Sequence, residues 1–459
     1  MATVFRQRVP WRSLALIASE TVLIVFAISS ATYILTPGGG LAPGELARAL
    51  MIVAVCQLCL YFAELYDFRI LAERRETFVR LLHALGAASV ILAVIYLFFP
   101  DLVIARGVFA ITAFLLIAFV GGWRWVFERV TRHLGHRERL LLVGTSPAAV
   151  SLARELHERR ELGVQIVGFV DPDPSRIGMP VFNPGIVGTL EDIPRITREQ
   201  SVDRVVVSLA DARGRLPMDK LLEMKLDGVA FAHLATVYEE YTGKISVENL
   251  RPSWLIFSRG FRKSRLLQAV KRTMDMAGAA AGILLTLPIM LGAAAAVRLT
   301  SPGPVLYQQQ RVGQHGRAFI LYKFRSMRAG AERETGPVWA ARDDDRITPV
   351  GRFIRRTRID ELPQLWNVLR GDMSLVGPRP ERPEFVQALM REIPFYGQRH
   401  VVKPGLTGWA QVRYAYGNSV EDAMEKLQYD LFYIKNMSFG LDVFIVFKTI
   451  QTVVLQRGT

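Results

Sequence analysis

Two adjacent carboxylates, Asp360 and Glu361, stand near the start of the stretch RIDELPQLWNVLRGDMSLVGPRP, residues 358–380. The apolar residues that follow recur at the spacing of one helical face, which predicts a helix over 361–370 that ends at Gly371. Asp360 is then a candidate N-cap of this helix, and that role alone can explain an aspartate here. Helix N-termini also favour anionic phosphate, so the same position suits chemistry on a phosphate ester.

Basic side chains in the same part of the chain suit an anionic substrate. The segment GPRP holds Arg379 between two prolines, which presents its guanidinium on a stiff loop suited to a diphosphate. Lys323, Arg325 and Arg358 are further candidate phosphate ligands, although any one of them alone is more often a solvated surface charge. Asp372, in the segment GDMS, is a second candidate acid near a metal ion.

The composition points to a membrane rather than to nucleic acid. The chain has 459 residues, of which 51% are hydrophobic, and a formal net charge of +15. Long apolar segments beside a basic excess suit anionic lipid headgroups or phosphorylated substrates. Aromatic residues are not interleaved with the basic stretches, so no nucleic-acid partner is expected. Cys56 and Cys59 lie inside an apolar run, which indicates small buried hydrophobes rather than a metal or redox site.

Four apolar segments precede residue 130, at about 14–35, 49–66, 81–99 and 108–127, each near the ~20 residues that cross a bilayer. Arginines cluster before the first, between the second and third, and after the fourth, which places both ends in the cytoplasm. These features predict a four-helix transmembrane bundle over residues 1–130, with buried core helices as the alternative. Glu20 is an isolated acid, which does not favour transport, and Arg124 is expected to snorkel to the cytoplasmic side.

The middle of the chain alternates between strands and helices. Strands are predicted at 140–144, 164–171, 203–209 and 229–235, with helices at 148–160 and 217–226, so a parallel, doubly wound sheet is expected. The first turn, GTSPAA, keeps only Gly144 of the dinucleotide-binding glycines, and Asp171 stands where an acid could bind a ribose. We therefore expect a Rossmann-like regulatory or oligomerisation domain over 138–260, without a nicotinamide cofactor.

A further apolar segment, residues 276–297, has no charge and is long enough to span a membrane. Basic residues flank it on both sides, among them Lys271 and Arg272 before it, so both ends look cytoplasmic. Pro288 lies inside it and should kink or break the helix. These features favour a re-entrant hairpin over about 273–298 that enters one leaflet and returns, with a fifth span as the alternative.

Five motifs, in order along the chain, resemble those of one family. They are KR..D before the hairpin, QQRVG, YKFRSM, DELPQLWNVLRGDMSLVGPRP and KPGLTGWAQV. Together they resemble the bacterial sugar transferase family, the monotopic polyprenyl-phosphate phosphoglycosyl transferases, over residues 262–459. The four spans and the Rossmann-like unit are similar to its long members, which are undecaprenyl-phosphate glucose or galactose phosphotransferases. The expected fold is therefore membrane α plus α/β, with a mixed α/β catalytic domain at 262–459.

This resemblance implies a reaction and roles for the acids. A hexose 1-phosphate would pass from a UDP-sugar to undecaprenyl phosphate, with release of UMP, to initiate exopolysaccharide or O-antigen synthesis. Asp360 would attack the sugar-proximal phosphate and form a phosphosugar-aspartyl intermediate, while Glu361 would hold Mg²⁺ or orient the pair. Asp360, Glu361 and Asp372 are the expected metal ligands, and Mn²⁺ could replace Mg²⁺.

The resemblance also implies a multi-pass protein of the bacterial inner membrane, in contact with membrane lipids and able to form a homodimer. Its N-terminus, middle domain and catalytic domain would lie on the cytoplasmic side. One departure is Leu287, because the family often has serine before the hairpin proline. The tail, residues 432–456, is expected to form interfacial helices on the membrane. A membrane-anchored nucleotide-sugar oxidoreductase or epimerase, or a non-catalytic scaffold, remains the alternative, and the motifs do not show which sugar is transferred.

Overall fold

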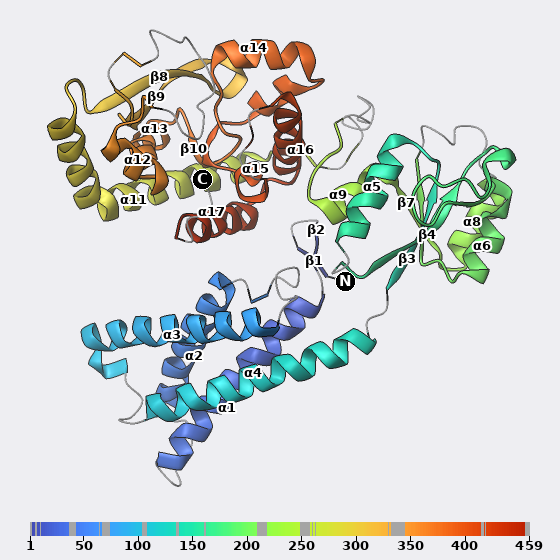
Figure 1. Cartoon of the computed structure of the whole chain (residues 1–459), viewed down its shortest axis with the longest axis horizontal. Coiled ribbons are helices and arrows are strands. Elements are labelled where there is room, and N and C mark those ends of the chain that lie inside the picture. The colour runs from blue at the N-terminus through green and yellow to red at the C-terminus, as the bar shows by residue number, and fades with distance from the viewer. Residues whose placement is uncertain are drawn as a thin grey trace. The chain divides into compact units, whose positions relative to one another are not determined.

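The computed structural model shows two compact units (Figure 1). Residues 1–4 and 8–234 form the first unit, and residues 5–7 and 235–459 form the second. The residues that the structure describes are 2–4, 7–9, 11–35, 43–63, 65–66, 74–102, 108–134, 137–159, 162–208, 218–247, 258, 260–261, 263–328, 330–331, 345–414, 417 and 419–454.

The first unit begins with two short paired strands, β1 (Ala2–Val4) and β2 (Gln7–Val9), which straddle the boundary between the units. Long helices follow at the four predicted apolar segments: α1 (Trp11–Leu35), α2 (Pro43–Phe62), α3 (Arg74–Phe98) and α4 (Val108–Leu134), with a short 3-10 turn at Pro100–Leu102. Within the described residues, three helices are long and apolar enough to cross a bilayer, at Leu14–Leu35, Thr77–Phe98 and Arg265–Thr300. These apolar helices make the chain a membrane protein, whereas the crossing of all four N-terminal segments stays a prediction.

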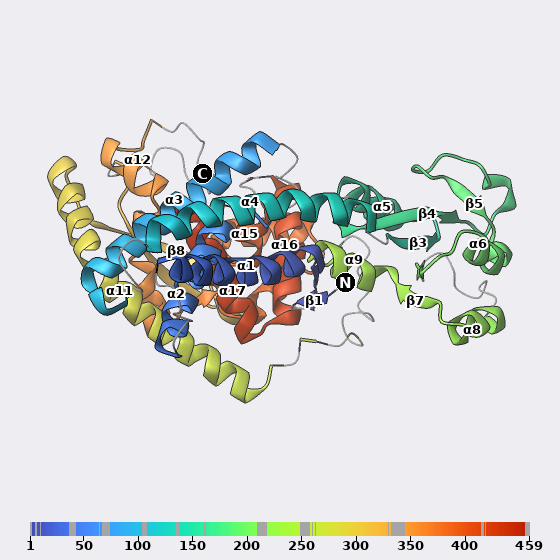
Figure 2. The same ribbon diagram turned by 90° about the horizontal axis from the view of Figure 1, so that it is seen from below.

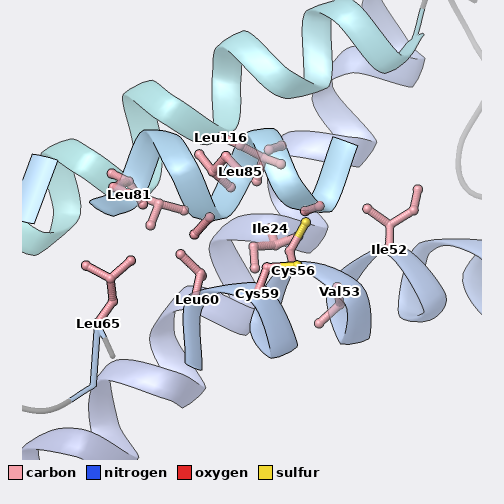
Figure 3. Close-up of a cluster of buried hydrophobic side chains, with 14 of the residues drawn as sticks. Ile24, Ile52, Val53, Cys56, Cys59, Leu60, Leu65, Leu81, Leu85 and Leu116 are labelled. Carbon is pink, nitrogen blue, oxygen red and sulfur yellow. The ribbon is translucent and has the colours of Figure 1, made fainter. Parts of the chain in front are cut away.

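Apolar side chains fill the space between the four N-terminal helices (Figure 3). Cys56 and Cys59 are both reduced and buried among leucine and isoleucine side chains such as Leu60 and Ile24. The interpretation of this CxxC as two small hydrophobes is confirmed.

The sequence suggested that Glu20 is an isolated acid, but the structure gives it two partners. Its carboxylate pairs with Arg124 at 2.6 Å from Nε to Oε1, and it accepts a hydrogen bond of 2.6 Å from the hydroxyl of Tyr66. Arg124 also donates to the carbonyl of Leu65 at 2.7 Å. The expectation that Arg124 snorkels to the surface is therefore wrong, because a buried carboxylate on another helix offers its charge a partner inside the helix group. Glu64, a second acid that the sequence shows near the end of an apolar segment, lies outside the described residues.

A parallel five-stranded sheet completes the first unit, in the order β5-β4-β3-β6-β7. Its strands are β3 (Glu138–Val143), β4 (Val164–Val170), β5 (Ile186–Gly188), β6 (Arg204–Val207) and β7 (Ala230–His233). Figure 1 shows α5 (Pro147–Glu158) on one face and α6 (Ile193–Glu199) and α8 (Met218–Leu226) on the other. The prediction of a parallel, doubly wound sheet is confirmed; β5 and α6 were not predicted, because a three-residue strand and a seven-residue helix carry little periodicity.

The second unit is mixed α/β. After α9 (Leu234–Thr242) and the long α11 (Arg265–Thr300) comes an antiparallel hairpin of β8 (Leu306–Val312) and β9 (Ala318–Phe324). A second, parallel pair joins β10 (Ser374–Val376) to β11 (Gly405–Thr407). The remaining helices are α12 (Pro349–Arg356), α13 (Gln364–Arg370), α14 (Pro383–Glu392), α15 (Trp409–Arg413), α16 (Val420–Asn436) and α17 (Phe439–Val454).

Helix α11 contains Pro288 and is bent into two arms (Figures 1 and 2). Of its 36 residues only Asp275, Ala279, Ala293 and Val297 are buried, and its leucines are largely exposed. In the first arm, a Cβ added to Gly278 would lie 2.6 Å from Leu375, so glycine here lets the helix approach the β10 segment closely. A bend at proline is what the sequence predicted, whereas entry and return through one leaflet stays a prediction.

The predicted tail, residues 432–456, begins in the last part of α16, and that part does not lie on the surface of the second unit. The nine residues from Leu427 to Lys435 are buried and form much of the core of the second unit. The later part of the tail, α17, has exposed apolar side chains, including Phe439, Val443 and Ile450. The mixed polar and apolar pattern of the tail suggested an interface, but Lys435 near its start is buried in an ion pair with Glu239.

Candidate active site

The two predicted acids lie on a 3-10 turn, η6 (Ile359–Glu361), between α12 and α13. Arg358, just before this turn, has φ 59°, so the chain reverses there in a left-handed conformation that is costly for a residue with a side chain. Helix α13 starts only at Gln364, with Pro363 at its N-cap, and ends at Gly371 with φ 97°. The predicted end is confirmed, but Asp360 is not the cap, because the proline starts the helix and the separate turn takes up both acids.

Glu361 is surrounded by cations. Its Oε1 accepts hydrogen bonds from Lys323 Nζ at 2.9 Å and from Arg379 Nη2 at 2.7 Å, and Arg358 Nη1 lies 3.8 Å away. Burial raises the pKa of Glu361, but the charges of Arg379, Lys323 and Arg358 together hold it well below its usual range. Glu361 is therefore an anion that gathers three predicted phosphate ligands at one point.

Asp360 is buried next to Glu361 but lacks comparable partners. Among the described residues, no side chain or backbone group donates a hydrogen bond to its Oδ1, which water cannot reach. Burial, and to a smaller extent the charge of Glu361, raises the pKa of Asp360 to about 6. The charges of Lys323, Arg355 and Arg358 lower this pKa but do not offset the rise. The anion of Asp360 is therefore less stabilised by its surroundings than that of Glu361, a pattern that is common at functional sites.

Lys323 reaches Glu361 from strand β9. The buried side-chain amide of Asn367 holds this strand against α13, the helix that follows the acids. Asn367 on α13 accepts a hydrogen bond from the amide of Tyr322 at 3.1 Å and donates to the carbonyl of Ile320 at 2.7 Å. Burial lowers the pKa of Lys323, which the charge of Glu361 opposes. The sequence analysis singled out neither Asn367 nor Arg355. Asn367 lies inside a long family motif and Arg355 in the basic run before Asp360, and neither feature indicates a role for one particular residue.

Arg325 and Asp372 are placed differently from Lys323. Arg325 donates from Nη2 to the carbonyl and hydroxyl of Ser301, both at 2.8 Å, so it binds the end of α11. Asp372 lies after α13, 3.5 Å from Arg370 and 3.5 Å from the amide of Asn367. The structure records no contact between either residue and the acid pair within its described ranges, so their roles stay predictions.

Lys271, Arg272 and Asp275 tie the first arm of α11 to the segment after α13. Lys271 Nζ binds Asp442 at 2.8 Å and the carbonyl of Val376 at 3.0 Å. Arg272 donates to the last carbonyls of α13, those of Val368 and Leu369, at 2.7 Å each. Asp275, which occurs in the motif KR..D, accepts from Ser374 and from the amide of Leu375 at 2.9 Å. These three residues therefore hold α13 and the β10 segment after it against the first arm of α11.

A divalent metal fits the acid pair only in part. No group of three or more His, Cys, Asp and Glu side chains comes together in the part of the chain that the structure describes. Mg²⁺, however, usually binds proteins through one or two carboxylates and takes its other ligands from substrate phosphates and water. The unpartnered Oδ1 of Asp360 suits such a site.

Fold and site together define a membrane protein with a buried carboxylate pair and a cluster of cations suited to phosphate esters. Sequence comparison adds the family. The model of the bacterial sugar transferase family matches residues 266–456, and that of a CoA-binding domain matches residues 61–216.

Three relatives illustrate the similarity. A UDP-N-acetylgalactosamine-undecaprenyl-phosphate N-acetylgalactosaminephosphotransferase of Aeromonas hydrophila is 46% identical over 226 residues, 49% of this chain and 52% of the relative. The UDP-glucose:undecaprenyl-phosphate glucose-1-phosphate transferase of Xanthomonas campestris pv. campestris is 32% identical, over 70% of this chain and 67% of the relative. The protein of the same name in Escherichia coli (strain K12) is also 32% identical, over 70% of this chain and 68% of the relative. The chain belongs to the bacterial sugar transferase family. It spans about half the length of the first relative and about two thirds of the other two.

Proposed function

We propose that this chain transfers a hexose 1-phosphate from a UDP-sugar to undecaprenyl phosphate, releases UMP and so initiates exopolysaccharide or O-antigen synthesis. The observation that carries the proposal is the buried, unpartnered carboxylate of Asp360 beside a Glu361 that gathers Lys323 and Arg379. The names of the relatives supply the substrate class.

Covalent catalysis by Asp360 divides the reaction into two displacements. In the first, a carboxylate oxygen of Asp360 attacks the sugar-proximal phosphorus, and the bond to the bridging oxygen breaks so that UMP leaves with that oxygen. The enzyme then holds a phosphosugar-aspartyl intermediate. In the second, an oxygen of undecaprenyl phosphate attacks the same phosphorus and releases the carboxylate of Asp360. The product is undecaprenyl diphosphate linked to the sugar.

The cations around Glu361 lower the repulsion between an anionic nucleophile and an anionic substrate. Lys323, Arg379 and Arg358 are held by Glu361 before substrate arrives, so no reorganisation is needed to offset the phosphate charge. Asp360 and Glu361 would hold Mg²⁺, or Mn²⁺, which would supply further positive charge when bound. Asp372 remains a predicted third ligand.

A UMP-release assay tests this function. The purified full-length protein is incubated with undecaprenyl phosphate and each of a panel of UDP-sugars, and UMP is quantified. We expect release with at least one UDP-hexose or UDP-N-acetylhexosamine, and a mass increase of one sugar phosphate on the peptide that contains Asp360 when the lipid acceptor is left out. Absence of UMP release across the panel would contradict the proposal.

The membrane arrangement is part of the proposal. We place the four N-terminal helices across the bacterial inner membrane, with the N-terminus, the α/β region and the acid pair on the cytoplasmic side. Helix α11 enters and leaves one leaflet; its Pro288, exposed leucines and basic ends support this. Cysteines at the exposed positions Arg265 and Pro302, in a background without Cys56 and Cys59, should both react with a polar thiol reagent from the cytoplasmic side. Labelling from opposite sides would make α11 a spanning helix.

The α/β region serves the same proposal as a regulatory or oligomerisation domain that supports a homodimer. Asp171 follows β4 and already binds Thr145 at 2.6 Å and Arg176 at 2.7 Å, which leaves it poorly placed to receive a ribose. We therefore expect no nicotinamide cofactor. Native mass spectrometry in detergent tests the dimer, and titration with NAD(H) tests the cofactor.

A further inference from the structure

The loop that carries Arg379 is held in an unusual way. Prolines 378 and 380 lack backbone N–H groups, so this loop cannot anchor itself through its own donors there. It is anchored through its acceptors instead. The four consecutive carbonyls from Pro378 to Glu381 each accept a hydrogen bond, from Gly405 N, Arg399 Nη2, Arg311 Nη1 and Val312 N at 2.9 to 3.1 Å.

Two of these four donors are arginine side chains. Arg399 Nη2 lies 3.0 Å from the carbonyl of Arg379, and Arg311 Nη1 lies 3.1 Å from that of Pro380. Arg379 in turn donates from its own guanidinium to Glu361 at 2.7 Å. The backbone of Arg379 is therefore held from one side while its side chain reaches the acid pair on the other.

Arg399 is itself fixed in place by buried partners. Its Nη2 lies 2.8 Å from Asp430 on α16, and its Nη1 donates to the hydroxyl of Tyr396 at 2.5 Å. The side chains of Arg399 and Asp430 are 6% and 2% exposed, so the pair lies in the core behind the loop. A buried ion pair is weak evidence for a stabilising role, because apolar side chains of similar volume often do as well. The hydrogen bond from Arg399 Nη2 to the carbonyl of Arg379 offers a more specific role.

We propose that Arg399, oriented by Asp430, and Arg311 are positioning residues that set where the Arg379 guanidinium meets the donor diphosphate. The inference rests on the proposed function. Neither Arg399 nor Arg311 touches the acid pair within the described residues. Arg399 acts through the carbonyl of Arg379, and Arg311 acts through the carbonyl of the next residue, Pro380.

The test separates positioning from stability with two matched double variants. Arg399→Met/Asp430→Leu removes the pair behind the loop. Lys435→Met/Glu239→Leu removes a second buried pair of the same unit, 2.5 Å apart and with both side chains 6% exposed. Each double variant removes one positive and one negative charge, so neither leaves an unpaired charge in the core. Thermal unfolding, UMP release and hydrogen exchange of peptides covering 377–381 are measured on the full-length protein.

We expect both double variants to unfold within a few degrees of the wild type. The Arg399→Met/Asp430→Leu variant should lose about 30- to 100-fold in kcat/KM for the UDP-sugar, with KM for undecaprenyl phosphate unchanged, because one mispositioned cation costs about this much. Its loop peptides should exchange faster. The Lys435→Met/Glu239→Leu variant should match the wild type in both measurements.

Arg399→Lys keeps the charge beside Asp430 but loses the fork that reaches Tyr396 and Arg379 together. This variant should fold and release UMP at about one tenth of the wild-type rate, which is more than the Arg399→Met/Asp430→Leu variant retains. A folded Arg399→Met/Asp430→Leu variant with UMP release and loop exchange like those of the matched control would overturn the proposal. If that variant does not fold, wild-type activity and loop exchange in both Arg399→Lys and Arg311→Lys would overturn it. Should the wild type release no UMP, the proposed function fails, while loop exchange still tests the positioning role.

Discussion

Glu20 in the N-terminal helices and Asp360 in the C-terminal unit are both buried carboxylates, but their surroundings differ. Glu20 has one cation of its own, Arg124, at 2.6 Å, and the hydroxyl of Tyr66 at 2.6 Å. Asp360 shares its surroundings with a second acid, Glu361, which takes the hydrogen bonds of Lys323 and Arg379. The described residues leave Asp360 Oδ1 without a donor.

This difference indicates that the carboxylate of Glu20 has a structural role and that the carboxylate of Asp360 has a chemical one. A buried carboxylate costs free energy unless it is paired, so most are paired, as Glu20 is. An exception needs an explanation, and a substrate or metal that arrives later is one. The carboxylate with its own ion pair, Glu20, predicts a stability defect on mutation, whereas the carboxylate that lies beside a second acid, Asp360, predicts a catalytic defect.

The largest expected effect is that of Asp360→Asn. An amide has the shape of the carboxylic acid but is not a nucleophile, so UMP release should fall by at least about 10⁴-fold. The variant should unfold at or above the wild-type temperature, because it removes a buried, poorly partnered charge. The UMP assay and a thermal scan on one preparation measure both. Turnover near the wild-type rate would move the nucleophile to another residue.

The counterpart in the first unit is Arg124→Met. It leaves the Glu20 carboxylate buried without its cation, which should lower the free energy of unfolding by about 3–5 kcal/mol. The double variant Glu20→Met/Arg124→Met should recover most of that loss, since no charge then remains unpaired. UMP release per folded molecule should stay at the wild-type level in both. A catalytic defect in the folded double variant would mean that this ion pair does more than join helices.

Glu361→Gln sharpens the comparison within the acid pair. Removing the anion that gathers Lys323 and Arg379 should reduce kcat by about 10²-fold. In the wild type, burial and then the charge of Glu361 raise the pKa of Asp360 to about 6, and the attacking form is the carboxylate, so the rate of UMP release should rise with pH through about 6 and then level off. In Glu361→Gln the acid limb should move to lower pH, because one of the two raising causes is gone while Lys323, Arg355 and Arg358 remain. An acid limb that does not move would show that another group limits the rate.

The sequence was most informative where the chemistry is local. Adjacent acids, prolines around Arg379 and the glycine after α13 are short-range features, and the structure brings Lys323, Arg358 and Arg379 to Glu361 as their types suggested. The start of α13 was wrong by three residues, because apolar periodicity marks a helical face but not the turn at which the helix begins.

Long-range pairs could not be predicted from spacing. Glu20 and Arg124 are 104 positions apart, and Arg399 meets Asp430 of α16 although β11 and α15 lie between them in the sequence. Such pairs depend on how helices pack, which a pattern of charges along one segment does not encode. The burial of the end of α16, from Phe432 to Lys435, was missed for the same reason, since Lys435 has its partner, Glu239, on another element.

The smallest expected effect concerns a third buried carboxylate, Asp171. It is satisfied like Glu20, by Thr145, by Arg176 and by the amide of Asp173 at 3.1 Å, but Arg176 is 41% exposed. Asp171→Asn should therefore cost only about 1–2 kcal/mol in the free energy of unfolding, because water can replace part of what is lost. Chemical denaturation of the variant and a UMP assay at matched folded concentration provide the measurement. Wild-type UMP release would place Asp171 with the structural carboxylates, whereas a loss of UMP release without a loss of stability would show that the α/β region acts on the reaction through this residue.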